Sequence, residues 1–157
     1  GAGMCFTIYM PQVDGPVDLV EEEAEQPARG PQRVLLVDDE PEIAEMAGDL
    51  LKKLGYDVRT LTSPFAALRA LESGGGNYDV LVTDLLMAEM SGPDLIRAAR
   101  EIRPDLPVIL MTGAPREGPP LDLGVGDFLE KPFGAQALGA AIQRALIDRK
   151  DPTIALR

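Results

Sequence analysis

Three short apolar runs, none interrupted by a polar residue, most strongly constrain what this chain can fold into. They occupy residues 34–37, 80–82 and 108–111. A strand with one face in water alternates apolar and polar residues, whereas a strand covered by helices on both faces reads as a continuous apolar run. Apolar residues at helical spacing separate the runs, and two further strands are expected at residues 57–61 and 128–129. The sequence therefore predicts an α/β fold in three layers, with a parallel sheet between helices.

Proline and glycine mark where the helices between these strands begin and end. Pro41 suits the first turn of a helix that Gly55 would end, and Ser63–Pro64 and Gly92–Pro93 open two more. Apolar residues at steps of three and four predict the faces that these helices and a fourth one bury. In chain order they are Ile43, Met46, Ala47, Leu50, Leu51 and Leu54; Phe65, Leu68 and Leu71; Leu95, Ile96, Ala99 and Ile102; and Leu138, Ala141, Ile142, Ala145 and Leu146.

Composition divides the chain into four segments. Residues 33–148 hold the regular alternation of strands and helices, and 157 residues leave room for one ordinary domain. Residues 14–32 combine prolines, glycines and a block of acids, which is typical of a flexible linker. Residues 1–13 contain one alternating strand pattern, which cannot fold alone, and residues 149–157 form a tail.

The charge of the chain disfavours two kinds of partner. Fifteen basic and 26 acidic residues give a net charge of −11, which repels nucleic acids and anionic lipids. No apolar run approaches the roughly 20 residues that span a bilayer, so no membrane contact is expected. Cys5 is the only cysteine and histidine is absent, which fits a soluble protein of the reducing cytoplasm.

Charged and polar residues follow four of the predicted strands. Asp38 and Asp39 follow the first, Asp84 ends the third, Thr112 ends the fourth and Lys131 follows the fifth. Right-handed crossovers bring the carboxyl ends of parallel strands to one edge of the sheet, so these side chains should converge. Carboxylates packed together cost on the order of several kcal/mol unless they are protonated or neutralised, and a hard divalent cation neutralises them.

The donor set favours Mg²⁺ and phosphoryl chemistry. Mg²⁺ keeps several waters and prefers one or two carboxylates together with a phosphate. One of the acids could then serve as a nucleophile, because an aspartate can form an acyl phosphate. Lys131 and Thr112 would hold the transferred oxygens.

Four stretches, in register with the predicted strands, resemble the receiver domain of two-component signalling. They read LLVDDEP, DVLVTDLLMAEMSG, PVILMTG and DFLEKPF, and the resemblance covers about residues 31–148. It implies a flavodoxin-like fold whose five parallel strands lie in the order 2-1-3-4-5. It also implies a switch module whose only chemistry is on itself, rather than an enzyme.

The resemblance assigns Asp84 as the phosphoacceptor and places it in a Mg²⁺ site. Asp39 would be a direct metal ligand, and Asp38 would act through a metal-bound water. The backbone carbonyl of Leu86 would complete the ligands that the protein supplies.

The resemblance also implies a switch and a partner. Thr112 would be the switch hydroxyl, Lys131 the ammonium that pairs with the phosphate, and Phe128 the aromatic that turns inward on activation. The donor would be a phosphohistidine on a histidine kinase or a phosphotransfer protein. A homodimer stays open as an alternative assembly.

One segment departs from the family pattern. Between the fourth and fifth strands, Pro119, Pro120, Gly124 and Gly126 each oppose the helix that the family has there. We expect this helix to be shortened or missing.

The first residues, GAGMCFTIYMP, resemble the closing strand of the ATP-binding domain of sensor histidine kinases. The end of a kinase domain, followed by a linker and then a receiver, is the order that implies the C-terminal receiver of a hybrid histidine kinase. An expression scar at residues 1–3 remains the alternative for the very start.

Other functions stay open at this stage. A pseudo-receiver that is never phosphorylated could serve as an interaction scaffold, although a scaffold does not need a repulsive acid cluster. A small Mg²⁺-dependent phosphatase would need a second acid two residues after the nucleophile, where this chain has Leu86. Asp38, Asp39 and Glu40 could also simply favour the N-terminus of the helix that Pro41 begins.

Overall fold

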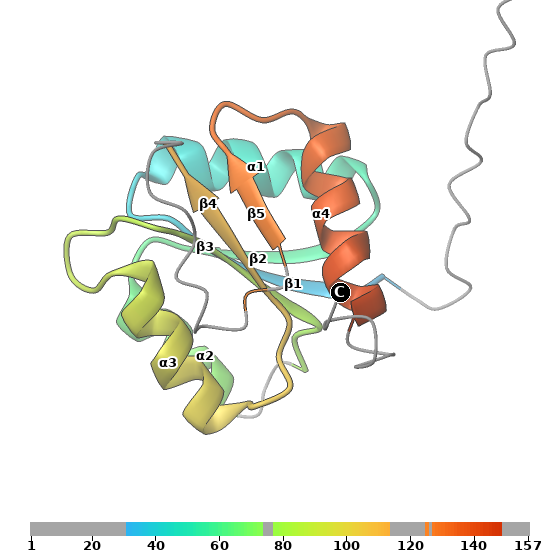
Figure 1. The fold of residues 1–157 in the computed structure, drawn as a ribbon. Coiled ribbons are helices and arrows are strands. Elements are labelled where there is room, and N and C mark those ends of the chain that lie inside the picture. The colour runs from blue at the N-terminus through green and yellow to red at the C-terminus, as the bar shows by residue number, and fades with distance from the viewer. Residues whose placement is uncertain (1–30, 74–76, 114–124, 126, 149–157) are drawn as a thin grey trace, which may run out of the picture.

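The computed structural model describes residues 31–73, 77–113, 125 and 127–148. Its five strands form one parallel sheet in the order β2-β1-β3-β4-β5 (Figure 1), which confirms the predicted strand order. The strands are β1 (Arg33–Val37), β2 (Asp57–Leu61), β3 (Val80–Asp84), β4 (Val108–Thr112) and β5 (Asp127–Glu130).

Four helices of the described residues cover the two faces of the sheet. They are α1 (Pro41–Lys53), α2 (Pro64–Glu72), α3 (Gly92–Ile102) and α4 (Ala135–Asp148). Helices α2 and α3 lie on one face, and α1 and α4 lie on the other (Figure 1). The predicted starts at Pro41, Pro64 and Gly92 are confirmed, and proline suits the first turn because its missing N–H would have no helical partner there. The expected shortening of a helix after β4 concerns residues 114–124, which lie outside the described residues.

Strand β1 shows why the apolar runs are continuous. Leu35 and Val37 pack in the cluster beneath α2 and α3, whereas Val34 and Leu36 pack in the cluster beneath α1 and α4. All four side chains are fully buried. A sheet covered on both faces leaves no solvated position from Val34 to Val37, and only Arg33 at the start of the strand is partly exposed.

Two of the predicted helix faces are partly wrong. Met46, Leu54 and Phe65, which we expected to be buried, are 48%, 47% and 48% exposed. The predicted Ala47, Leu51 and Leu71 are buried, and small residues fill further buried positions, which are Ala44 and Gly48 on α1 and Ala67 and Ala70 on α2. Helix α1 lies close to β2 at Gly48, where an added Cβ would lie 2.5 Å from Thr60 Cγ2, so this position has no room for a larger side chain.

Among the described residues, every helix is too short or too polar to cross a membrane.

Candidate functional site

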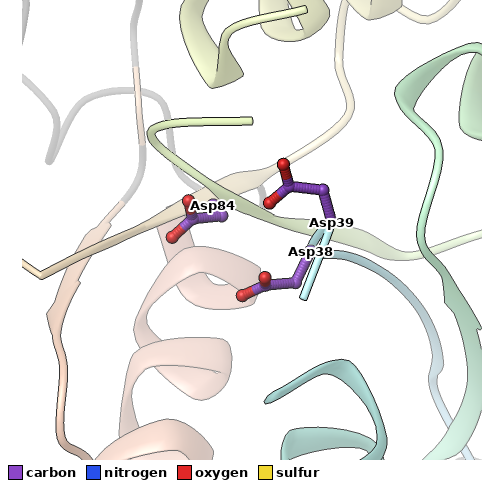
Figure 2. Close-up of side chains that lie close together, drawn as sticks. All are labelled: Asp38, Asp39 and Asp84. Carbon is purple, nitrogen blue, oxygen red and sulfur yellow. The ribbon is translucent and has the colours of Figure 1, made fainter. Parts of the chain in front are cut away.

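Three aspartates meet where β1 and β3 end. Asp38 and Asp39 follow β1, and Asp84 is the last residue of β3 (Figure 2). The two strands pair directly with Val37 opposite Thr83, so Asp38 and Asp84 emerge side by side. One carboxylate oxygen from each aspartate lies within 4.8 Å of the others. Asp38 is fully buried and Asp84 is 7% exposed, so water alone does little to screen their repulsion.

Lys131 reaches this cluster from the end of β5. Its Nζ lies 2.7 Å from Asp38 Oδ2 and 2.7 Å from Asp84 Oδ1. The Lys131 backbone N–H donates to the carbonyl of Thr112 at 2.7 Å, which fixes the chain at this point against β4. The Lys131–Pro132 peptide bond is cis, a feature that the sequence analysis does not anticipate.

The pKa of Lys131 depends on its burial and on the two carboxylates that it contacts. Burial lowers this pKa, but the hydrogen bonds and negative charges of Asp38 and Asp84 outweigh burial and raise it above the ordinary 10.5. Lys131 is therefore an ammonium at neutral pH. One ammonium against three carboxylates leaves two negative charges, which is the charge that a divalent cation would balance.

Backbone amides hold the carboxylates in place. Asp38 Oδ1 accepts from the Glu40 amide at 3.0 Å, and Asp84 Oδ2 accepts from the Leu86 amide at 3.0 Å. Asp39 Oδ2 accepts from the Ala88 amide at 2.7 Å. A carboxylate has about four lone-pair sites, so these bonds orient the groups without exhausting their capacity to bind a cation. Three oriented carboxylates with closely spaced oxygens fit a hard cation such as Mg²⁺.

The remaining predicted residues lie around this cluster. Thr112 ends β4, one position beyond the pairing of Asp84 with Met111, and is half-buried. Leu86, two residues after Asp84, is 75% exposed. Phe128 is half-buried on β5 and packs against the cluster beneath α2 and α3.

The structure adds two features that the sequence analysis misses. Ser63 Oγ donates to Glu89 Oε2 at 2.8 Å and so ties the start of α2 to the loop after β3. Gly92 begins α3 so close to β3 that an added Cβ would lie 2.3 Å from the Asp84 carbonyl oxygen. The sequence shows Gly92 only as part of a helix start, because nothing in it reports how near the two elements lie.

Comparison with known proteins identifies the family. A family model described as the response regulator receiver domain matches residues 34–143. The chain belongs to that family. Its acidic cluster and Lys131 are thus part of a receiver domain of the kind used in two-component signal transduction.

Similar proteins include sensor kinases and isolated receivers. The chain is 33% identical to the sensor kinase CckA of Brucella abortus over 93% of its own length, but spans only 17% of that kinase. A receiver domain from Clostridium thermocellum has 32% identity and a TM-score of 0.65, covering 76% of this chain and 97% of that one. The receiver domain of the hybrid histidine kinase CckA has 31% identity and a TM-score of 0.62, covering 73% of this chain and 98% of that one.

Proposed function

We propose that this receiver accepts a phosphoryl group from a phosphohistidine donor onto Asp84, in a Mg²⁺-dependent reaction, and changes conformation in response. The observation that carries the proposal is the contact between the Lys131 ammonium and an oxygen of Asp84, 2.7 Å apart, beside two further carboxylates. Such a contact supplies a fixed positive charge where phosphoryl oxygens would arrive.

The transfer needs little chemistry beyond positioning. An Asp84 oxygen forms a bond to phosphorus while the phosphorus–nitrogen bond of the phosphohistidine breaks, and the nitrogen leaves with the bonding electrons. The Leu86 amide, 3.0 Å from Asp84 Oδ2, and the Lys131 ammonium orient the attacking carboxylate. The proposed product is an aspartyl phosphate, so the chain acts chemically only on itself.

Four residues would hold the metal. Asp39, Asp84 and the backbone carbonyl of Leu86 are the proposed direct ligands, and Asp38 is proposed to act through a metal-bound water. A bound Mg²⁺ would neutralise charge on the transferred oxygens. The arrangement of the donors supports this assignment, because all three carboxylates offer oxygens within 4.8 Å of one another.

Two residues are proposed to convert phosphorylation into a change of shape. Thr112 lies at the end of β4, beside β3, so its hydroxyl group could follow the new phosphoryl oxygens. Phe128 is half-buried on the neighbouring strand β5, so part of its surface is still exposed and could become buried in the switch. A Phe128 side chain that is more buried in the phosphorylated chain than in the unphosphorylated chain would support this switch.

Acetyl phosphate provides the direct test. Incubation with Mg²⁺ should add the mass of one phosphoryl group to the chain, and omission of Mg²⁺ should abolish the addition. Asp84→Asn should not be labelled, whereas Asp94→Asn, an exposed acid on α3, should be labelled like the wild type. Equal labelling of Asp84→Asn and the wild type would overturn the assignment.

The same experiment separates the alternatives. A pseudo-receiver that acts only as a scaffold would take up no phosphoryl group under any of these conditions. A Mg²⁺-dependent phosphatase would instead turn over a generic phosphoester, and that turnover would depend on Asp84.

The parent protein is proposed to be a hybrid histidine kinase of the cytoplasm. The similarity to the Brucella abortus sensor kinase covers 93% of this chain, so it must include most of the residues before Arg33 that the family model leaves unmatched. Phosphotransfer profiling tests this proposal. A kinase or phosphotransfer protein of the same organism that loads Asp84 within seconds would identify the donor.

A further inference from the structure

Three arginines gather around one tyrosine at the end of the sheet opposite the acidic cluster. Tyr78, just before β3, is only 2% exposed. The Arg33 guanidinium carbon lies 5.4 Å from the centre of the Tyr78 ring, which is within the range of a cation–π contact. Arg59 Nη1 donates to the Tyr78 hydroxyl oxygen at 3.3 Å, and Arg103 Nη2 donates to the Tyr78 carbonyl at 3.5 Å. We call Arg33, Arg59 and Arg103 the arginine rim.

Two charges of the arginine rim are not neutralised by the described part of the chain. Arg33 pairs with Asp57 at 3.0 Å, and its amide donates to Asp79. Arg59 and Arg103, in contrast, make no ion pair with any described carboxylate. Lys53 and Arg69 also lack such a pair, but the arginine rim gathers its charges around Tyr78, beside the start of β1.

The sequence offers an acidic segment within reach of the arginine rim. Glutamates occupy positions 21, 22, 23 and 25, and the chain enters β1 at Arg33, which is itself part of the rim. Each extended residue spans up to about 3.3–3.6 Å, so the residues between this segment and Arg33 allow it to reach Arg59 and Arg103. A short tether also raises the effective concentration of the segment to about the millimolar range, where weak ion pairs are populated.

We propose that the acidic run at residues 21–25 binds the arginine rim and pairs with Arg59 and Arg103. Binding fixes the direction in which the linker leaves the receiver, on the side of the sheet away from Asp84. This inference is independent of the proposed phosphotransfer, because it concerns a different surface and different residues.

A spin label on the linker tests the contact in the complete chain. Cys5 is the only cysteine, so a Cys5→Ser and Ala24→Cys chain takes a nitroxide at one place, inside the acidic run. We expect strong paramagnetic broadening of the amide signals of Arg59 and Tyr78, and weak broadening of Ile142 on α4. The difference in broadening between the rim residues and Ile142 should fall at least about twofold when salt rises to roughly 1 M, where the screening length falls to about 3 Å.

Charge variants of the labelled chain make the test specific. Arg59→Gln with Arg103→Gln should remove the selective broadening. The matched control, Arg97→Gln with Arg144→Gln, should keep it, because those arginines already pair with Asp94 and Asp127. If the rim variant does not fold, replacing the four glutamates of the acidic run with glutamine provides the same test outside the folded domain.

Two results would overturn the proposal. One is broadening that is equal over all faces of the receiver or unchanged in the rim and glutamine variants. The other is broadening that appears when labelled chain is mixed with unlabelled, isotopically enriched chain, because the acidic run would then bind a second copy.

Discussion

At the scale of single residues, Lys131 balances part of the negative charge of the site. It is the only ammonium in contact with Asp38 and Asp84 in the described part of the chain, and its side chain is 15% exposed. Replacing it with an uncharged residue of similar length leaves two buried carboxylates facing each other. Removal of one partner from a buried ion pair commonly costs several kcal/mol.

We therefore predict that Lys131→Met lowers the free energy of unfolding by about 3 kcal/mol in the absence of divalent cations. Added Mg²⁺ should restore more stability to this variant than to the wild type, because the uncompensated charge is larger. Urea unfolding with and without Mg²⁺ measures both effects. Lys52→Met is the control, since its surface pair with Asp49 should contribute less than about 1 kcal/mol. Equal unfolding midpoints for Lys131→Met and the wild type would contradict the prediction.

Ionisation of Tyr56 should make the free energy of unfolding depend on pH in the alkaline range. Burial raises the pKa of Tyr56 above its ordinary 10.0, and a side-chain hydrogen bond with Gln143 only partly opposes this effect. A folded-state pKa that is raised above the unfolded value adds stability that is complete below about pH 10 and is lost as the pH rises through the folded-state pKa.

The wild type should therefore lose stability above about pH 10 more steeply than Tyr56→Phe does. At neutral pH the variant should be less stable by about 1 kcal/mol, because it lacks the hydrogen bond to Gln143. Urea unfolding across the alkaline range measures the slopes, and ultraviolet absorbance of the phenolate reports the titration. Parallel slopes for the two proteins would argue against a raised pKa.

At the scale of elements, the close approach of α3 to β3 links packing to the site. A Cβ on Gly92 would meet the Asp84 carbonyl oxygen at 2.3 Å and Leu110 Cδ1 at 2.9 Å. The leucine side chain can shift, but the backbone carbonyl cannot move without moving Asp84.

Gly92→Ala should accordingly lower the free energy of unfolding by about 2 kcal/mol and reduce labelling of Asp84 by acetyl phosphate. Thermal unfolding and mass spectrometry measure the two effects. Gly134→Ala serves as the control, because no heavy atom lies within 4 Å of its added Cβ and its cost should stay within about 0.5 kcal/mol. Wild-type stability in Gly92→Ala would mean that α3 can move away from β3 at little cost.

The elements also show how far the sequence predicts this fold. The parallel sheet and the helix starts follow from the continuous apolar runs and from Pro41, Pro64 and Gly92, whereas the strand order follows only from the resemblance to receiver domains. The buried helix faces do not follow as well, because hydrophobicity favours Met46 and Phe65, whereas alanine and glycine occupy many of the buried positions of α1 and α2.

Some contacts of the candidate site can likewise be predicted from the sequence, and others cannot. Topology alone brings Asp38, Asp84 and Lys131 to one edge, so residue types at strand ends were sufficient to predict their proximity. The amide of Ala88 on Asp39 and the hydroxyl of Ser63 on Glu89 depend on loop conformation instead. No residue pattern in the sequence specifies those loop contacts.

At the scale of the whole molecule, a bound cation should stabilise the entire domain. Mg²⁺ that binds only the folded chain adds about 2.7 kcal/mol at a concentration one hundred times its dissociation constant. We predict that the thermal midpoint rises with Mg²⁺ in the wild type and in Asp94→Asn, but much less in Asp39→Asn. Thermal scans over a Mg²⁺ series measure this dependence. An equal rise in Asp39→Asn would show that the cation acts elsewhere on this acidic surface.

The ion pair between Lys131 and Asp38 joins residues 93 positions apart. A ribosome therefore synthesises all three aspartates of the cluster long before it adds the lysine that balances them. A nascent chain, or a proteolytic fragment that ends before β5, carries the acids without their counterion. Truncation between β3 and β5 should thus keep the three acids but remove Lys131, so the proposed phosphoryl transfer should require a chain that extends through β5.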